Sequence, residues 1–304
     1  MMEAETNIKM RTEVEVLQQP RLPAWEEELW TNKSKIIYGP VASRRLGESL
    51  GINLFPKTKI CSFNCRYCDV GLTPPSAMQE EFLRGNILPP ETIMKEIEKG
   101  IRYHLTKGTH IDYVTICGNG EATDYPYFVE VANFVLSLKT SLFPAIPVAI
   151  LTNSANVHRK EVVDVINKFD VNFFKLDAGD EETFNAIGRP LTGVIGFHEI
   201  IEGLRSVQRL NIQTAIVDSP RVSNIPSLKG PFIELLKELQ PVAVYIHNID
   251  YPTPDSTIRR LELEEMVELG QFIAERSGIP VKVLHSLIDL RRQPRRGRTH
   301  EPSA

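Results

Sequence analysis

The chain has 304 residues, of which 42% are hydrophobic and 24% are charged, and its formal net charge is −4. These values are ordinary for a globular protein, and the length is sufficient for one large domain or two small ones with a substantial buried core. They exclude a global field that attracts nucleic acid, and no apolar run approaches the roughly 20 residues of a membrane span.

The first 36 residues are polar and show little periodicity, so we expect them to form a peripheral N-terminal extension. Within this extension, Trp25 and Trp30 flank a segment that can form a short amphipathic turn. The opening residues lack the charged and then apolar pattern of a signal peptide. With the few, clustered cysteines, this predicts a reducing, cytoplasmic location.

A strand is expected at residues 49–55, where the composition is apolar and rich in strand formers. It is preceded by the glycine-bounded segment 38–47, which contains Arg44 and Arg45. These two cations are candidates for binding a substrate anion, and a solvated turn is the equally weighted alternative. The strand leads directly into a cysteine-rich loop, so its carboxyl end brings that loop to the site.

The loop contains three of the four cysteines of the chain, Cys61, Cys65 and Cys68, at Cys-x3-Cys-x2-Cys spacing. Three thiolates can hold a [4Fe–4S] cluster and leave one iron without a protein ligand, open to a substrate or cosubstrate. A structural zinc site usually needs four ligands, and the fourth cysteine, Cys117, lies about fifty residues further on. A disulfide framework is not expected in a long chain with so few cysteines.

Beyond residue 90 the sequence alternates between helical and strand patterns. The first helix starts at Glu91 and has Ile93, Ile97 and Ile101 on one face. Further strands are expected at residues 109–117, 147–152, 171–177, 211–217, 242–247 and 281–284. The helices between them are expected from residue 125 and at 158–168, 181–187, 197–210, 231–239 and 261–276. Six strand-then-helix units and one late strand predict a parallel sheet with right-handed crossovers, either an incomplete barrel or an open doubly wound sheet.

Polar or glycine-containing segments follow the expected strands, at the edge where βα barrels place their active sites. The first is Gly118-Asn119-Gly120-Glu121, in which glycine allows the backbone to approach a ligand closely. The other strand-end candidates are Asn153, Ser154, Lys175, Asp177, Gln213, His247 and Asn248. Helix caps and turns are the alternative role for such residues. Cys117, next to the glycine segment, is expected to be a packed core thiol.

The cysteine spacing, with Tyr67 before the third cysteine, resembles the radical S-adenosylmethionine (SAM) superfamily. The resemblance implies an α/β fold, an incomplete (βα)6 parallel barrel. It also implies that SAM binds the open iron of a [4Fe–4S] cluster and is cleaved by one electron to a radical that abstracts hydrogen from a substrate. An electron donor such as flavodoxin or ferredoxin is implied as a partner.

The resemblance also assigns roles to the candidate residues. The segment from Gly118 to Glu121 looks like the Gly-Gly-Glu motif that binds the SAM amino group. Tyr67 is expected near the adenine, Asn153, Ser154 and Lys175 are SAM-contact candidates, and Asp177 is a SAM or substrate contact. Gln213 and the pair His247-Asn248 are candidates for substrate or adenine contact.

Further motifs resemble the branch of iron–sulfur oxidoreductases related to the tRNA wyosine-synthesis enzyme. They are the segment 38–47, Gly118-Asn-Gly-Glu-x-Thr, Lys175-Leu-Asp-Ala-Gly-Asp and Arg189-Pro190. The wyosine enzyme has a second cluster on cysteines upstream of the triad, whereas this chain has no cysteine before Cys61. Wyosine synthesis itself is therefore not expected.

The predicted organisation is an extension at 1–36, a barrel domain at 37–285 and a basic tail at 286–304. The tail contains five arginines between positions 291 and 298. They suggest an RNA substrate, and the alternative is a solvated segment that binds nothing specifically. The alternative to a radical SAM enzyme is a non-catalytic iron–sulfur or zinc protein used in sensing, electron transfer or structure.

Overall fold

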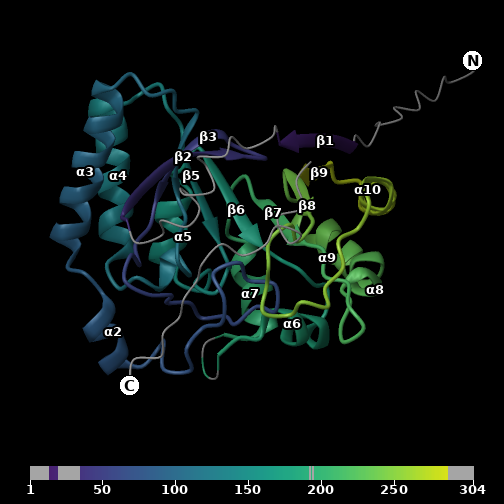
Figure 1. Ribbon diagram of the computed structural model, residues 1–304. Helices are drawn as coiled ribbons and strands as arrows, with labels where there is room; N and C mark the ends of the chain where they lie inside the picture. Colours follow the sequence, from purple (N-terminus) through teal and green to yellow (C-terminus); the bar gives the residue numbers. More distant parts are fainter. Residues whose placement is uncertain (1–13, 20–34, 192, 194, 287–304) are drawn as a thin grey trace, which may run out of the picture.

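One curved sheet of nine strands organises the computed structural model, which describes residues 14–19, 35–191, 193 and 195–286 (Figure 1). The strand order is β1-β9-β8-β7-β6-β5-β4-β3-β2. The strands are β1 Val14–Gln19, β2 Ile37–Ser43, β3 Gly47–Ile52, β4 Tyr113–Ile116, β5 Val148–Thr152, β6 Val171–Lys175, β7 Asn211–Ala215, β8 Ala243–His247 and β9 Val281–Ser286. Every neighbouring pair is parallel except the antiparallel hairpin of β2 and β3.

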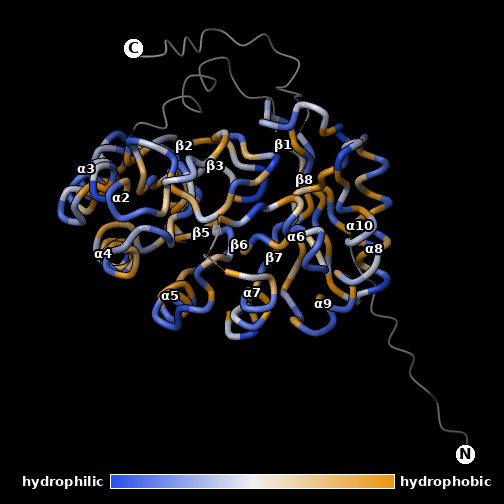
Figure 2. The backbone as a smooth tube through the Cα atoms, turned by 90° about the horizontal axis from the view of Figure 1, so that it is seen from below, coloured by the Kyte–Doolittle hydropathy of each residue, from blue (hydrophilic) through white to orange (hydrophobic). Residues whose placement is uncertain are grey.

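Helices cover the convex face of the sheet (Figure 2). The helices are α2 Glu80–Asn86, α3 Pro90–Thr106, α4 Phe128–Leu142, α5 Lys160–Ile166, α6 Glu181–Gly188, α7 Phe197–Leu204, α8 Ile225–Lys229, α9 Pro231–Leu239 and α10 Leu263–Ser277, with a 3₁₀ turn at Ala122–Asp124. In α3, Ile93, Ile97 and Ile101 are buried as the spacing predicts. The predicted α/β parallel half-barrel is confirmed. No helix in the part of the chain described here is long and apolar enough to cross a bilayer.

The concave face of the sheet contains a small apolar layer beneath the strand ends. Alternate residues of a strand point to opposite faces, so Phe174 and Ile246 pack under the helices while their neighbours Phe173 and Tyr245 point into the barrel. The Phe173 and Tyr245 rings meet edge to face with centroids 4.9 Å apart. The next inward positions on β6 and β8 are Lys175 and His247, so the polar site lies directly above an apolar floor.

The two edges of the sheet differ most from the sequence prediction. Residues 14–19, which were assigned to a peripheral extension, form β1 and pair in parallel with β9, Val14 opposite Val281. Residues 37–43 form β2, an antiparallel partner that the sequence did not predict. Both edges depend on tertiary pairing, which short local patterns do not reveal. The segment from Trp25 to Trp30 and the arginine tail lie outside the described residues.

Candidate functional site

A cavity of about 340 Å³ opens at the carboxyl ends of the parallel strands. All three clustered cysteines line it, and none of them forms a disulfide. Cys61 and Cys65 are buried, and Cys68 is partly exposed. The cavity also receives Gly118, Gly120 and Glu121 from the end of β4, as well as side chains from β5 to β8. The structure therefore brings the cysteine loop and the predicted strand-end residues to one place.

The cysteine loop is held on two sides. Toward β4, the Ser62 amide donates to Asp124 Oδ2 at 2.7 Å, and the Ser62 hydroxyl donates to the same carboxylate, at 2.6 Å from Oδ1. Toward α6, the Asn64 amide donates to the Arg189 carbonyl at 3.0 Å, and the Arg66 amide donates to the Ile187 carbonyl at 3.1 Å. Because these are backbone anchors, the loop conformation does not depend on a bound metal alone.

Three nitrogen donors point at the cysteine sulfurs. Lys59 Nζ lies 3.1 Å from Cys68 Sγ, while Asn153 Nδ2 and the Phe63 amide lie 3.5 and 3.4 Å from Cys61 Sγ. Such donors stabilise thiolates, the form in which cysteine binds iron. Burial raises the pKa of the Cys61 thiol well above its usual value, and burial raises that of Cys65 to about 11. The two thiols are therefore protonated until a metal displaces the protons.

The donor set consists of three thiols, and among the described residues no group of three His, Cys, Asp or Glu side chains is arranged to hold one metal ion. The three thiols nevertheless share one cavity, with their sulfurs supported by hydrogen-bond donors. Three cysteines around a common cavity suit a [4Fe–4S] cluster, whose irons are spread over the corners of a cube.

The glycine segment after β4 packs directly on the residue before Cys61. Gly120 has φ of +115° and forms a bridge with Ile60, whose carbonyl accepts the Glu121 amide at 2.9 Å. A Cβ at position 120 would lie 1.7 Å from the Ile60 carbonyl oxygen. Glycine is thus required here by both conformation and space, and it fixes the glycine segment against the cysteine loop.

Glu121 is buried, and four hydrogen bonds hold its carboxyl group. The donors are the amides of Thr123 and Asn153 and the hydroxyls of Thr123 and Thr152. Burial first, and then the charge of Asp124, raises the pKa of Glu121 from 4.5 to about 7, although the hydrogen bonds act in the opposite direction. The carboxyl group lies at the wall of the cavity and therefore gains or loses its proton near neutral pH.

This shift predicts a pH-dependent stability. The folded protein holds the Glu121 proton up to a pH of about 7, whereas the unfolded chain releases it near 4.5. The resulting stabilisation is complete below pH 4.5 and is lost as the pH rises through 7. Between pH 5 and 8, the free energy of unfolding of the wild type should fall by about 2–3 kcal/mol relative to that of Glu121→Gln, measured by urea denaturation. Parallel pH profiles for the two proteins would contradict the shift.

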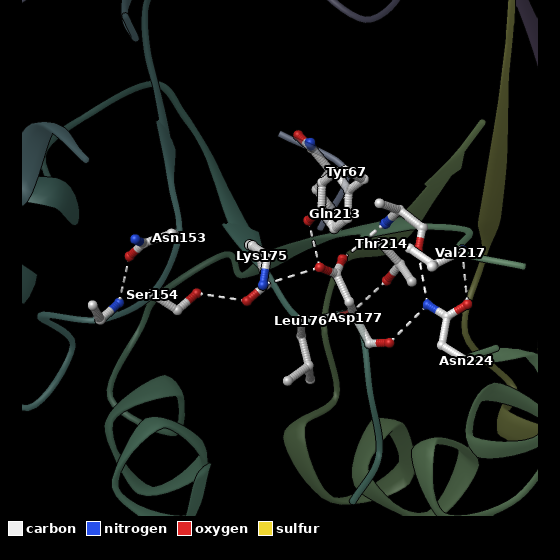
Figure 3. A network of polar contacts seen from close by, with 12 residues as sticks. Tyr67, Asn153, Ser154, Lys175, Leu176, Asp177, Gln213, Thr214, Val217 and Asn224 are labelled. Carbon is white, nitrogen blue, oxygen red and sulfur yellow. Dashed lines mark hydrogen bonds and ion pairs between the residues drawn. The ribbon is translucent and has the colours of Figure 1, made fainter. Parts of the chain in front are cut away.

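Lys175, Asp177 and Tyr67 form a charged network beside Cys65 (Figure 3). Lys175 Nζ lies 3.0 Å from Asp177 Oδ2, and the Tyr67 hydroxyl donates to the same oxygen at 2.5 Å. Burial alone lowers the pKa of a lysine, but the charge of Asp177 outweighs it and raises the pKa of Lys175 above its usual value. Lys175 is therefore a fixed cation at the rim of the cavity.

Three of the predicted SAM contacts support the cavity from behind its lining. Asn119 donates its side-chain amide to the Phe55 carbonyl at 3.2 Å, and the Ser154 hydroxyl donates to the Lys175 carbonyl at 2.8 Å (Figure 3). Asp177 is buried and orients Tyr67 and Lys175. The other predicted SAM contacts, namely Tyr67, Gly118, Gly120, Glu121, Asn153 and Lys175, line the cavity.

The predicted substrate residues separate in the same way. Gln213 and His247 line the cavity, and Gln213 Nε2 lies 3.2 Å from His247 Nε2. Burial, and then the charges of Arg44 and Arg45, hold the pKa of His247 well below its usual value, so the ring is neutral. Asn248 also lines the cavity, but its side chain accepts from the Leu261 amide and donates to the Leu261 carbonyl, so its amide group is already engaged in the fold.

Several residues of the site were not singled out from the sequence. Lys59 and Asp124 each contact the cysteine loop. Their positions in the sequence could have indicated this, because Lys59 is a cation just before the triad and Asp124 is a carboxylate three residues after Glu121. Tyr38 donates its hydroxyl to the Cys117 carbonyl at 2.8 Å. Cys117 is not the fully packed thiol that we expected, because it is partly exposed and lines the cavity.

Comparison with known proteins gives a consistent family. The sequence model of the radical SAM superfamily matches residues 55–230. A UPF0026 protein of Helicobacter pylori strain J99 is 32% identical over 245 residues, covering 78% of this chain and 73% of that protein. A UPF0026 protein of Methanocaldococcus jannaschii is 33% identical over 252 residues, covering 80% and 72%. These names state no activity.

Two solved structures share the fold. A radical SAM methyltransferase from Sphaerobacter thermophilus superposes with a TM-score of 0.56 at 16% identity, covering 78% of this chain and 66% of that one. TYW1 with a lysine–pyruvate adduct bound gives 0.51 at 17% identity, covering 84% and 83%. At these identities, the likeness applies to the fold alone.

Proposed function

Because the chain belongs to the radical SAM superfamily, we propose that it is an enzyme that cleaves SAM reductively and abstracts hydrogen from a substrate. One observation carries the proposal. Cys61, Cys65 and Cys68 line the same cavity as Gly118, Gly120 and Glu121, at the carboxyl ends of the barrel strands. A cluster carrier without catalytic activity has no need of the second group of residues.

Cys61, Cys65 and Cys68 would hold a [4Fe–4S] cluster, with one iron left for a ligand that is not part of the protein. When bound, the cluster supplies the electron that cleaves SAM. Lys59 and Asn153 donate to the sulfurs of Cys68 and Cys61 and so favour their thiolates. Phe63, fully buried and stacked edge to face on Phe184, keeps water from the loop on the α6 side.

SAM would lie between the glycine segment and the ends of β5 and β6. Gly120 gives the backbone a close approach, and the Glu121 carboxyl group, when ionised, suits the SAM ammonium group. Lys175 offers a positive charge to the methionine carboxylate, and Tyr67 an aromatic ring next to Cys68. The rigid hydrogen bonds of Glu121 and Asp177 mean that these groups are in place before the ligand arrives.

The test is product formation by the reconstituted protein. The chain is purified without oxygen, loaded with iron and sulfide, reduced and mixed with SAM. We expect 5′-deoxyadenosine, even if slowly, because many such reactions proceed without the physiological substrate. Its complete absence from a protein with a full cluster would refute the proposal. Metal analysis that finds zinc in place of iron would favour the non-catalytic alternative.

An electron donor of the flavodoxin or ferredoxin class would reduce the cluster, and a reducing cytoplasm would preserve it. RNA is the substrate class suggested by the branch resemblance and by the arginines at 291–298. Deletion of these residues is expected to abolish binding to RNA. Unchanged binding would remove the main feature of this chain that favours an RNA substrate.

A further inference from the structure

The turn between β2 and β3 carries two neighbouring arginines with different environments. Arg44 Nη1 lies 2.6 Å from Asp250 Oδ2, and the same carboxylate also receives Arg260 Nε at 2.8 Å. The Asp250 side chain is 2% exposed, so one buried carboxylate holds both arginines. Arg44 is therefore engaged by an acceptor of the protein itself.

Arg45 is partly buried and has no such partner among the described residues. Its Nε and Nη1 atoms are shielded from solvent and have no hydrogen-bond partner among the described residues. Its guanidinium lies over the Phe173 ring, 5.4 Å from the centroid. Burial, and then the charge of Arg44, lowers the pKa of Arg45 to about 10, which leaves it charged at neutral pH.

N–H groups that are shielded from water and have no acceptor are costly, and an anionic ligand would supply the missing acceptor and charge. The contact with Phe173 offsets part of this cost, but an aromatic face supplies no acceptor for the N–H groups. Arg45 lines the same cavity as the cysteines. Any anion that reaches it from the cavity therefore lies within the site already described.

The position of Arg45 separates it from the expected SAM contacts. Phe173, beneath the guanidinium, precedes Lys175 by two positions on β6, and a strand rises about 6–7 Å over two residues. Arg45 thus lies one inward-facing layer below the strand-end groups. The Gln213–His247 pair lies in the upper layer, and because His247 is neutral it adds no competing cation there.

We propose that Arg45 binds an oxyanion of the substrate, a carboxylate or a phosphate group, and holds the substrate below SAM. The inference rests on the proposed function, because only a substrate beside SAM gives this subsite a purpose. Arg45 contributes a planar guanidinium suited to oxyanions. Phe173 and Tyr245 form the apolar floor beneath it, and Arg44 is already engaged by Asp250.

The experiment compares thermal unfolding midpoints of cluster-loaded wild type, Arg45→Gln and Arg44→Gln, with inorganic phosphate or acetate against chloride at equal ionic strength. Without added oxyanion, Arg45→Gln should be at least as stable as the wild type, because it loses an uncompensated charge. Saturating phosphate or acetate should raise the wild-type midpoint by about 2–4 °C and leave Arg45→Gln unchanged. The anion that acts at lower concentration distinguishes a phosphate from a carboxylate.

Arg44→Gln is the matched control, because it removes the same charge one residue away. It should unfold at a lower temperature, since Asp250 loses a buried partner, and should keep the response to the oxyanion. Equal responses of wild type and Arg45→Gln to both anions, or a midpoint of Arg45→Gln well below the wild type, would overturn the proposal.

SAM is added in a separate arm. If Arg45→Gln lost the stabilisation that SAM gives to the wild type, the anion would be the SAM carboxylate and the assignment to substrate would be wrong. None of these readouts requires SAM cleavage. A protein that makes no 5′-deoxyadenosine would thus refute the proposed function, whereas failure of the anion response in a protein that makes it would refute only this inference.

Discussion

Replacing Cys65 with serine is expected to remove the iron–sulfur cluster and reduce 5′-deoxyadenosine formation below detection. Cys65 lies in the middle of the triad, is buried and lines the cavity. Two remaining thiolates cannot hold a [4Fe–4S] cluster in the same manner, because another iron loses its protein ligand. The measurements are iron and sulfide content after anaerobic reconstitution, the visible absorption of the cluster, and product analysis.

Cys117→Ser is the matched control for this prediction. Cys117 lines the same cavity but lies outside the triad, so its replacement should leave the iron content unchanged. If Cys65→Ser kept its cluster, the ligand assignment would be wrong. If Cys117→Ser lost the metal as fully as Cys65→Ser, a four-cysteine site of the zinc type would replace the cluster in our interpretation.

Replacing Gly120 with alanine is expected to destabilise the protein by more than about 3 kcal/mol. The new Cβ would lie 1.7 Å from the Ile60 carbonyl oxygen, and φ of +115° is unfavourable for any residue with a Cβ. Relief requires the glycine segment to separate from the chain that leads into Cys61. We therefore also expect reduced cluster loading and a loss of SAM binding, measured on the reconstituted protein.

Gly108→Ala is the control that separates the cost of a positive φ from the cost of a steric clash. Gly108 also has positive φ, +65°, but an added Cβ meets no atom within 4 Å. It should cost only about 1–2 kcal/mol in urea denaturation and should leave cluster loading unchanged. Equal losses for the two variants would mean that the contact with Ile60 does not position the glycine segment.

The sequence predicted the centre of the fold better than its edges. The strands that became β4 to β8 are short apolar runs bounded by turns, and their carboxyl ends converge because parallel pairing places them together. β1 was missed because its partner, β9, lies more than 260 residues away, as the pairing of Val14 with Val281 shows. The alternation of Val14, Glu15 and Val16 suits a strand, but so short a run does not show which strand it pairs with.

The candidate site shows a similar limit. Residue type and position at strand ends identified Glu121, Lys175 and Gln213, but not whether a side chain faces the cavity or supports it. Ser154 and Asp177 follow strands in the same way, and yet they orient neighbouring residues. Arg44 and Arg45 are equivalent in sequence, and only the place of Asp250 in the fold separates the paired arginine from the unpaired one.

The most direct test of the central claim is electron paramagnetic resonance of the reduced, reconstituted protein with and without SAM. If Cys61, Cys65 and Cys68 hold a cluster with one open iron, a [4Fe–4S]⁺ signal should appear and should change when SAM binds that iron. A signal that is identical with and without SAM, or a protein that contains zinc and gives no signal, would contradict the account.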